Sequence, residues 1–166
     1  MGSGKENHRE VKFGVDAMLG RLVRVLRFYG FDTEYYRDER DVEIVGRCLR
    51  EKRVLITSDR GLVRMAKAWN LEVYYVEDPS RDPWELAKEI ISDFDVKVEP
   101  FTRCPKCNGK LKIVSKWEVE GFVHPFVWNK FDEFAVCENC GQIYWEGTHY
   151  ERIIKKLNLL KNPEQI

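Results

Sequence analysis

Two pairs of cysteines constrain the fold of this chain more than any other feature of the sequence. Cys104 and Cys107 form one C-x2-C pair, Cys137 and Cys140 form the other, and 29 residues lie between the pairs. A glycine follows each pair within two residues, which lets backbone N–H groups approach the sulfur atoms. Four thiolates at this spacing are typical of a closed, structural, tetrahedral zinc site. The sequence therefore predicts a zinc ribbon, and the competing interpretation is a pair of redox-active dithiols.

The segment between the cysteine pairs is rich in aromatic side chains. We expect it to form the hairpins of the ribbon, with some rings packed in a core and others free to stack on nucleic-acid bases. These residues are Trp117, Phe122, Phe126, Trp128, Phe131 and Phe134. Cys48, in contrast, stands alone on the apolar face of an expected helix, which predicts a small buried core residue.

The first 99 residues alternate between short apolar segments and helical patterns. Such alternation predicts an α/β fold with a parallel sheet covered on both faces by helices. The expected strands are 11–15, 33–36, 53–57 and 71–76, and the expected helices are 18–29, 42–49, 62–69 and 83–91. The alternation stops near Pro100. We expect a flexible leader (1–10), an α/β domain (11–99), the zinc ribbon (100–147) and a C-terminal helix and tail (148–166).

The charges of the chain balance, with 28 Lys and Arg against 28 Asp and Glu. This balance excludes nucleic-acid binding through bulk charge, so any such binding needs a local patch. No stretch approaches the roughly 20 apolar residues of a membrane span. The first ten residues also lack the apolar segment of a secretory signal. We therefore expect a cytoplasmic protein with no membrane partner, whose cysteines do not form disulfides.

Acidic residues follow three of the expected strands. Asp16 directly follows the first, Asp38 and Asp41 follow the second with Glu43 one turn into the next helix, and Asp59 follows the third. The carboxyl ends of parallel strands share one edge of a sheet, so these carboxylates are expected to converge. Such a cluster favours a bound cation, and Mg²⁺ or Mn²⁺ suits oxygen ligands and phosphodiester hydrolysis. The alternative is that each aspartate only caps the helix that follows, with Asp41 as an N-cap.

Arginines lie beside the expected acidic edge. The helix after Asp16 carries Arg21, Arg24 and Arg27 and no acid, and Arg60 follows Asp59. Guanidinium groups suit phosphate, so we expect Arg21, Arg24 and Arg60 to hold RNA; the alternative is a solvated helix face paired with nearby acids. The sequence contains no glycine-rich nucleotide-binding motif and no serine-hydrolase motif. His149 begins the last expected helix, where it either caps the helix or contacts RNA.

Several segments together resemble a known family. They are Phe13-Gly-Val-Asp-Ala-Met-Leu-Gly-Arg-Leu22, Leu55-Ile-Thr-Ser-Asp-Arg60, the two cysteine pairs, and Ile143-Tyr-Trp-Glu-Gly-Thr-His149. In these segments the chain resembles the Mut-seven C-terminal RNase domain family, over about residues 11–154. The resemblance implies a PIN-like parallel sheet flanked by helices, together with a C-terminal zinc ribbon.

The resemblance also implies a function. We expect a metal-dependent endoribonuclease that hydrolyses phosphodiester bonds in RNA, with single-stranded RNA as the substrate. The catalytic, metal-binding acids carry over to Asp16, Asp41 and Asp59, with Asp38 and Glu43 as further candidates. PIN-like nucleases usually have a fourth acid, for which this chain offers only Asp78 or Asp82. The alternative is a non-catalytic RNA- or ribosome-binding module with the same fold, and the sequence identifies no protein partner.

Overall fold

The computed structural model describes residues 9–158, so residues 1–8 of the expected leader and the tail after 158 lie outside the described residues. The chain divides into two compact units that meet between Phe101 and Thr102. Arg9 belongs to the first unit, because it forms a parallel bridge with Val96 and an ion pair with Glu72.

The first unit is built on a four-stranded parallel sheet with the order β2-β1-β3-β4. The strands are β1 (Lys12–Asp16), β2 (Thr33–Tyr36), β3 (Arg53–Thr57) and β4 (Val73–Tyr75). β1 lies in the interior of the sheet, with its Gly14 paired to Glu34 of β2 and Leu55 of β3. This parallel sheet and its helices confirm the predicted α/β fold class.

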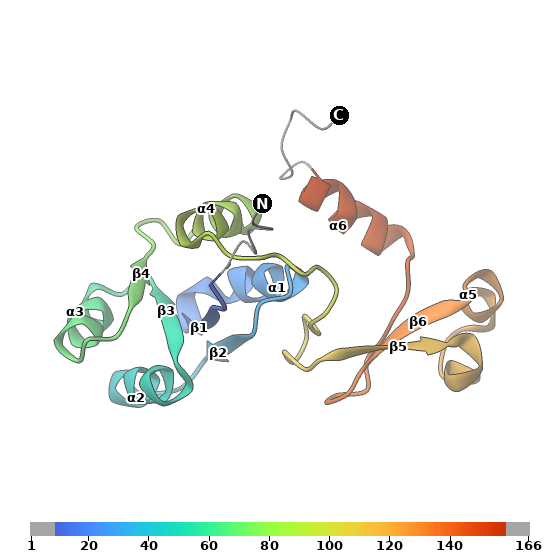
Figure 1. The fold of residues 1–166 in the computed structure, drawn as a ribbon, viewed down its shortest axis with the longest axis horizontal. Helices are drawn as coiled ribbons and strands as arrows, with labels where there is room; N and C mark the ends of the chain where they lie inside the picture. The colour runs from blue at the N-terminus through green and yellow to red at the C-terminus, as the bar shows by residue number, and fades with distance from the viewer. Residues whose placement is uncertain (1–8, 159–166) are drawn as a thin grey trace, which may run out of the picture. The chain divides into compact units, whose positions relative to one another are not determined.

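Helices cover both faces of this sheet (Figure 1). They are α1 (Gly20–Phe28), preceded by the short 3-10 helix η1 (Ala17–Leu19), then α2 (Asp41–Glu51), α3 (Arg60–Ala68) and α4 (Pro83–Phe94). α1 and α4 cover one face, where Phe94 packs edge-on against Phe13 at 5.9 Å between ring centroids. α2 and α3 cover the other face, where Ile44 and Leu62 join Leu55 in one buried cluster.

Two of these α-helices begin at an aspartate cap. Asp59 caps α3 by accepting from the Gly61 and Leu62 amides, and Asp82 caps α4 with Pro83 in its first turn. The prediction for α2 was wrong, because Arg40 is its N-cap and Asp41 is its first helical residue. Glu43 accepts from the Arg40 amide and pairs with its guanidinium, which fixes the start one residue earlier.

The second unit contains an antiparallel sheet with the order β5-β6-β7. Its elements are β5 (Leu111–Ser115), the 3-10 helix η2 (Lys116–Val119), α5 (Pro125–Lys130), β6 (Glu133–Cys137), β7 (Ile143–Tyr144) and α6 (Thr148–Asn158). Val114, Val119 and Phe134 form its buried cluster.

The aromatic segment of this unit differs from the predicted hairpins. Phe134 lies in β6, but Trp117 lies in η2, and Phe126 and Trp128 lie in α5. Local signals favour the helix over a strand: Pro125 opens it, and the His124 ring accepts from the Phe126 amide as an N-cap. The indole of Trp128 then donates to the Lys116 carbonyl at 2.7 Å, which ties α5 to η2.

Candidate functional site

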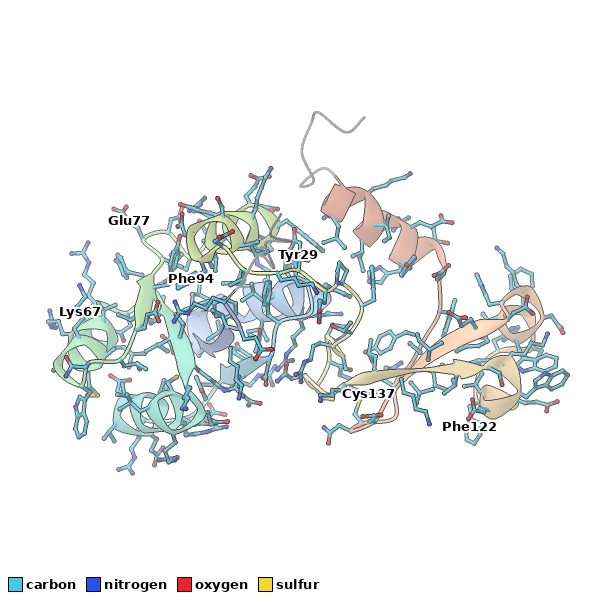
Figure 2. All side chains as sticks on the ribbon, in the orientation of Figure 1. Tyr29, Lys67, Glu77, Phe94, Phe122 and Cys137 are labelled. Atoms are coloured by element: carbon cyan, nitrogen blue, oxygen red, sulfur yellow. The ribbon has the colours of Figure 1, made fainter. Side chains whose placement is uncertain are left out.

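The four paired cysteines come together as a metal centre at one end of the ribbon sheet. Figure 2 shows Cys137 at this end of the second unit and Phe122 at the other. All four sulfur atoms lie within 4.8 Å of one another. The Cys104 and Cys140 sulfurs are 3.8 Å apart, and those of Cys107 and Cys137 are 3.4 Å apart. A tetrahedral site with Zn–S bonds of about 2.3 Å requires sulfur separations of about 3.8 Å. The donor set and spacing therefore fit zinc.

Neighbouring groups orient the thiols of this centre. Amide N–H groups reach two sulfurs at 3.4 Å, from Gly109 to Cys107 and from Asn139 to Cys137. Gly109 has no room for a side chain, because a Cβ there would lie 2.7 Å from the Cys137 sulfur. Such surrounding hydrogen bonds hold metal ligands in place and adjust their basicity.

The Tyr144 hydroxyl is a further neighbour, which the sequence analysis missed. It lies 3.0 Å from the Cys104 sulfur. The sequence offered one signal, because Tyr144 follows the second cysteine pair closely. A tyrosine in that place is also an ordinary strand residue, so the signal was weak.

The surroundings of the cysteine centre shift the pKa values of two thiols in opposite directions. Burial alone would raise the pKa of Cys107, but hydrogen bonds from Asn139 and Gly109 outweigh it and lower that pKa to about 6. Burial raises the pKa of Cys140, and the neighbouring cysteines raise it further. A divalent cation removes this conflict because coordination deprotonates thiols outright.

A second candidate site lies at the carboxyl edge of the parallel sheet. β1 leads into α1 on one face, and its neighbour β3 leads into α3 on the opposite face. The two chain directions diverge here, and in open α/β sheets ligands bind in the crevice at such a point. Asp16 ends β1, and Asp59 follows β3 by two residues. These two predicted residues therefore lie at the same edge, on adjacent strands.

One buried hydroxyl connects the two aspartates. Thr57 Oγ1 donates to Asp16 Oδ2 at 2.9 Å and accepts from the Asp59 amide at 3.0 Å. Asp16 Oδ1 accepts from the Ala17 amide at 2.8 Å, and Asp59 Oδ1 accepts from the Gly61 amide at 2.7 Å. Each aspartate thus caps the helix that follows it. The Asp16 carboxylate is also held by Thr57 of the neighbouring strand.

Ser58 adds an unexplained polar atom at this edge. Its Oγ is buried and has no hydrogen-bond partner among the described residues. Buried polar atoms are nearly always paired, so an orphan between Thr57 and Asp59 indicates a place for a water molecule or a ligand. The sequence contained the signal in the consecutive hydroxyl residues before Asp59, but such pairs are common at strand ends.

The remaining acids follow β2, on the other side of β1. Asp38 and Asp41 are exposed after β2, the other neighbour of β1. Glu43 pairs with Arg40. The hydrogen bonds and charge of Arg40 hold the pKa of the Glu43 carboxyl below its ordinary value. Over residues 9–158, the four cysteines are the one group of three or more potential ligand residues with donor atoms within 4.8 Å.

The two aspartates proposed as a fourth acid have other partners. Asp78 accepts hydrogen bonds from Ser80, and Asp82 caps α4.

The predicted arginines divide into exposed and structural groups. Arg21 and Arg24 are exposed on α1, and Arg21 donates to the Ser80 carbonyl at 3.5 Å. Arg60 is also exposed and donates to the Tyr75 hydroxyl at 3.2 Å. Arg27 differs from the expected basic face, because it is buried and donates to the Thr33 carbonyl at 3.0 Å. His149 is exposed in the first turn of α6.

The fold and the two sites define a class of protein: a parallel α/β domain with aspartates at its carboxyl edge, followed by a four-cysteine ribbon. Within this class, the chain belongs to the Mut7-C RNAse domain family, whose model matches residues 11–157. No curated protein matches the chain. Family membership assigns an RNase-related role. Across the described helices, none combines the length and apolar character needed to cross a membrane.

Proposed function

We propose that this protein is a metal-dependent endoribonuclease that hydrolyses phosphodiester bonds in single-stranded RNA. The observation that carries the proposal is the placement of Asp16 and Asp59 on adjacent strand ends, linked through the Thr57 hydroxyl. Membership of an RNase domain family supports the same reaction. Zinc-binding cysteines require reducing surroundings, so we place this activity in the cytoplasm.

The residues at the acidic edge fit a hard divalent cation such as Mg²⁺ or Mn²⁺. Asp16 and Asp59 would provide carboxylate oxygens, and Asp41, Asp38 and Glu43 would act through bridging water from the β2 side. Asp59 uses Oδ1 as a cap, and its Oδ2 makes no hydrogen bond within residues 9–158. When bound, such a cation supplies a water of lowered pKa and offsets charge on the phosphate.

The protein's own groups would perform the remaining tasks. Thr57 holds Asp16 in one orientation, so the carboxylate needs little rearrangement before it acts. Arg21, Arg24 and Arg60 would bind phosphates on either side of the cleaved bond, since guanidinium groups match phosphate geometry. The ribbon would stabilise the chain through zinc and offer exposed rings, such as Trp117 and Phe122, for stacking on bases.

Cleavage of RNA by the Asp16→Asn variant tests the proposal. Asparagine keeps the shape of the side chain but removes a charge that a cation needs, so cleavage should fall by orders of magnitude while the melting temperature stays near that of wild type. Asp95→Asn is the matched control, because Asp95 is the exposed C-cap residue that follows α4. The assay compares mixed structured and unstructured RNAs with Mn²⁺, with Mg²⁺ and with chelator. Equal, chelator-sensitive cleavage by wild type and Asp16→Asn contradicts the proposal.

One observation favours the alternative of a non-catalytic RNA- or ribosome-binding module. Asp16 and Asp59 both cap helices, so their presence has a structural reason that needs no catalysis. Under this alternative, RNA binding persists in the Asp16→Asn variant and without added Mg²⁺ or Mn²⁺, and no cleavage occurs in wild type. The same assay, combined with a binding measurement, therefore separates the two functions.

A further inference from the structure

A cavity of about 170 Å³ lies on the α1 and α4 side of the sheet in the first unit. Met18 and Arg21 line it from η1 and α1, Pro79 and Arg81 from the β4–α4 connection, and Pro83 from the first turn of α4. Pockets that enclose a whole small ligand usually measure roughly 300–1,000 Å³. This cavity is smaller, so it suits a single flat group of a larger ligand.

One part of the cavity wall is apolar. Leu19, Leu22 and Leu86 are buried and form part of the lining, together with the two proline rings. Met18 contributes a flexible thioether chain and is 58% exposed although it is apolar. Side chains of this kind pack against flat rings, and methionine adapts to irregular shapes. A nucleobase splayed out from single-stranded RNA has the matching shape and surface.

Two guanidinium groups, those of Arg21 and Arg81, line the cavity. Arg21 reaches the Ser80 carbonyl only at 3.5 Å, the long limit of a hydrogen bond. Arg81 pairs with Glu89 at 2.7 Å, but both side chains are over 40% exposed. Exposed ion pairs contribute little free energy, so Arg81 can exchange Glu89 for a phosphate. Asp78 accepts two hydrogen bonds from Ser80, which orders the loop that carries Arg81.

The position of the cavity connects it to the acidic edge. Asp16 caps η1, and Met18 and Leu19 of that same short helix line the cavity. Resting on the proposed nuclease function, we propose that this cavity holds one base of the single-stranded RNA beside the cleaved phosphate. Arg81, together with Arg21, binds the phosphate attached to that nucleotide. No role for Arg81 was predicted from the sequence.

Binding of a fluorescent single-stranded RNA, measured by anisotropy without added Mg²⁺ or Mn²⁺, tests the cavity without any cleavage. Arg81→Gln should weaken binding about tenfold, the loss of one charge-assisted contact. It should also reduce the salt slope by about 0.7, as expected for one lost phosphate contact on a single strand. Arg50→Gln is the control, because Arg50 is exposed on α2 across the sheet; its affinity and slope should match wild type.

RNAs with one abasic position, scanned along the strand, test the base-binding part. An abasic site at one position should weaken binding to wild type. The same abasic site should weaken binding to the Met18→Ala variant less, because that variant has already lost part of the cavity wall.

Wild-type affinity for Arg81→Gln, or equal abasic effects at every position, overturns the cavity proposal and leaves the nuclease proposal standing. Absence of cleavage with Mn²⁺, combined with the expected binding losses, overturns the nuclease and keeps the cavity. Absence of RNA binding by wild type overturns both.

Discussion

At the scale of single residues, the Thr57 hydroxyl organises the acidic edge. It is fully buried, so its position is set by β3 and not by solvent. It donates to a carboxylate on one strand and accepts from the amide that precedes α3. The orientation of Asp16 therefore depends on a residue that would itself touch neither substrate nor cation in the proposed reaction.

Thr57→Val should reduce the rate of RNA cleavage, and this loss should exceed what its reduced stability explains. Valine keeps the shape of threonine but leaves the Asp59 amide and one Asp16 oxygen without this partner, which costs about 1–3 kcal/mol of unfolding free energy. Thr33→Val is the control, because Thr33 is equally buried and its hydroxyl donates to the Phe31 carbonyl at the opposite end of the sheet. Urea unfolding should show losses of stability in both variants, whereas cleavage should fall only in Thr57→Val. A parallel loss of cleavage in Thr33→Val would contradict a role specific to Thr57.

Single residues also show what the sequence could and could not predict. Asp16 and Asp59 were predictable as neighbours at one edge, because each follows an apolar strand of a parallel sheet. The link through Thr57 was not predictable, since it depends on the register that pairs the end of β1 with the end of β3. Arg27 was misassigned to an exposed basic face because its burial depends on the position of Thr33 in the adjacent strand.

At the scale of elements, β1 is the strand on which the first unit depends. It pairs with both β2 and β3, and α2 packs closely over its Gly14. A Cβ on Gly14 would lie 2.6 Å from the Tyr36 ring and 2.8 Å from the Cys48 sulfur. Cys48 is therefore a packed core residue, as predicted, and its burial raises the pKa of its thiol.

Gly14→Ala should destabilise the first unit by about 1–3 kcal/mol, because the added methyl group overpacks this contact. Gly46→Ala is a control that should change the free energy of unfolding in the opposite direction. Gly46 lies inside α2, where a Cβ would meet only the mobile end of Arg50 at 3.4 Å. Alanine there should stabilise the helix by about 0.5–1 kcal/mol. Urea unfolding monitored by circular dichroism measures both changes, and a stable Gly14→Ala variant would show that α2 can move away from β1.

The elements of the two units differed in how well the sequence predicted them. The strands and helices before Pro100 follow clear apolar periods and carry helix caps, so their existence and order could be predicted. The segment between β5 and β6 could not, because its aromatic residues favour strands in general. Pro125 and the His124 cap instead favour the helix α5. The prediction relied on the aromatic composition of the segment and missed this local signal.

At the scale of the whole molecule, the two units rely on different sources of stability. The first unit buries apolar residues on both faces of its sheet. Within residues 102–158, the buried cluster of the ribbon sheet consists of Val114, Val119 and Phe134, with six partly buried apolar residues packed against it. A core of this size rarely supplies enough free energy to fold a domain alone, and many small domains add a structural metal. The sequence predicted this arrangement because matched cysteine pairs indicate a metal directly.

Removal of zinc should therefore unfold the ribbon and spare the sheet of the first unit. Cys137→Ser, or strong chelator, should abolish one zinc per chain and the ribbon's protection from hydrogen exchange, because metal binding supplies folding free energy. Acidification should have the same effect, since protons compete with zinc for thiolates and zinc is lost as the pH falls. Cys48→Ser is the control, because its sulfur lies in the core of the first unit; it should keep its zinc. Full zinc content in Cys137→Ser would exclude the four-cysteine centre.

The capping role of Asp16 and Asp59 has a consequence for the history of such proteins. Asparagine caps a helix about as well as aspartate, so a single base change could remove the charge at this edge without harming the fold. If the proposed nuclease acts through these carboxylates, a lineage could lose cleavage in one step and keep a stable chain that still binds RNA. Active and inactive descendants would share every strand and helix, and would differ at one or two carboxylates.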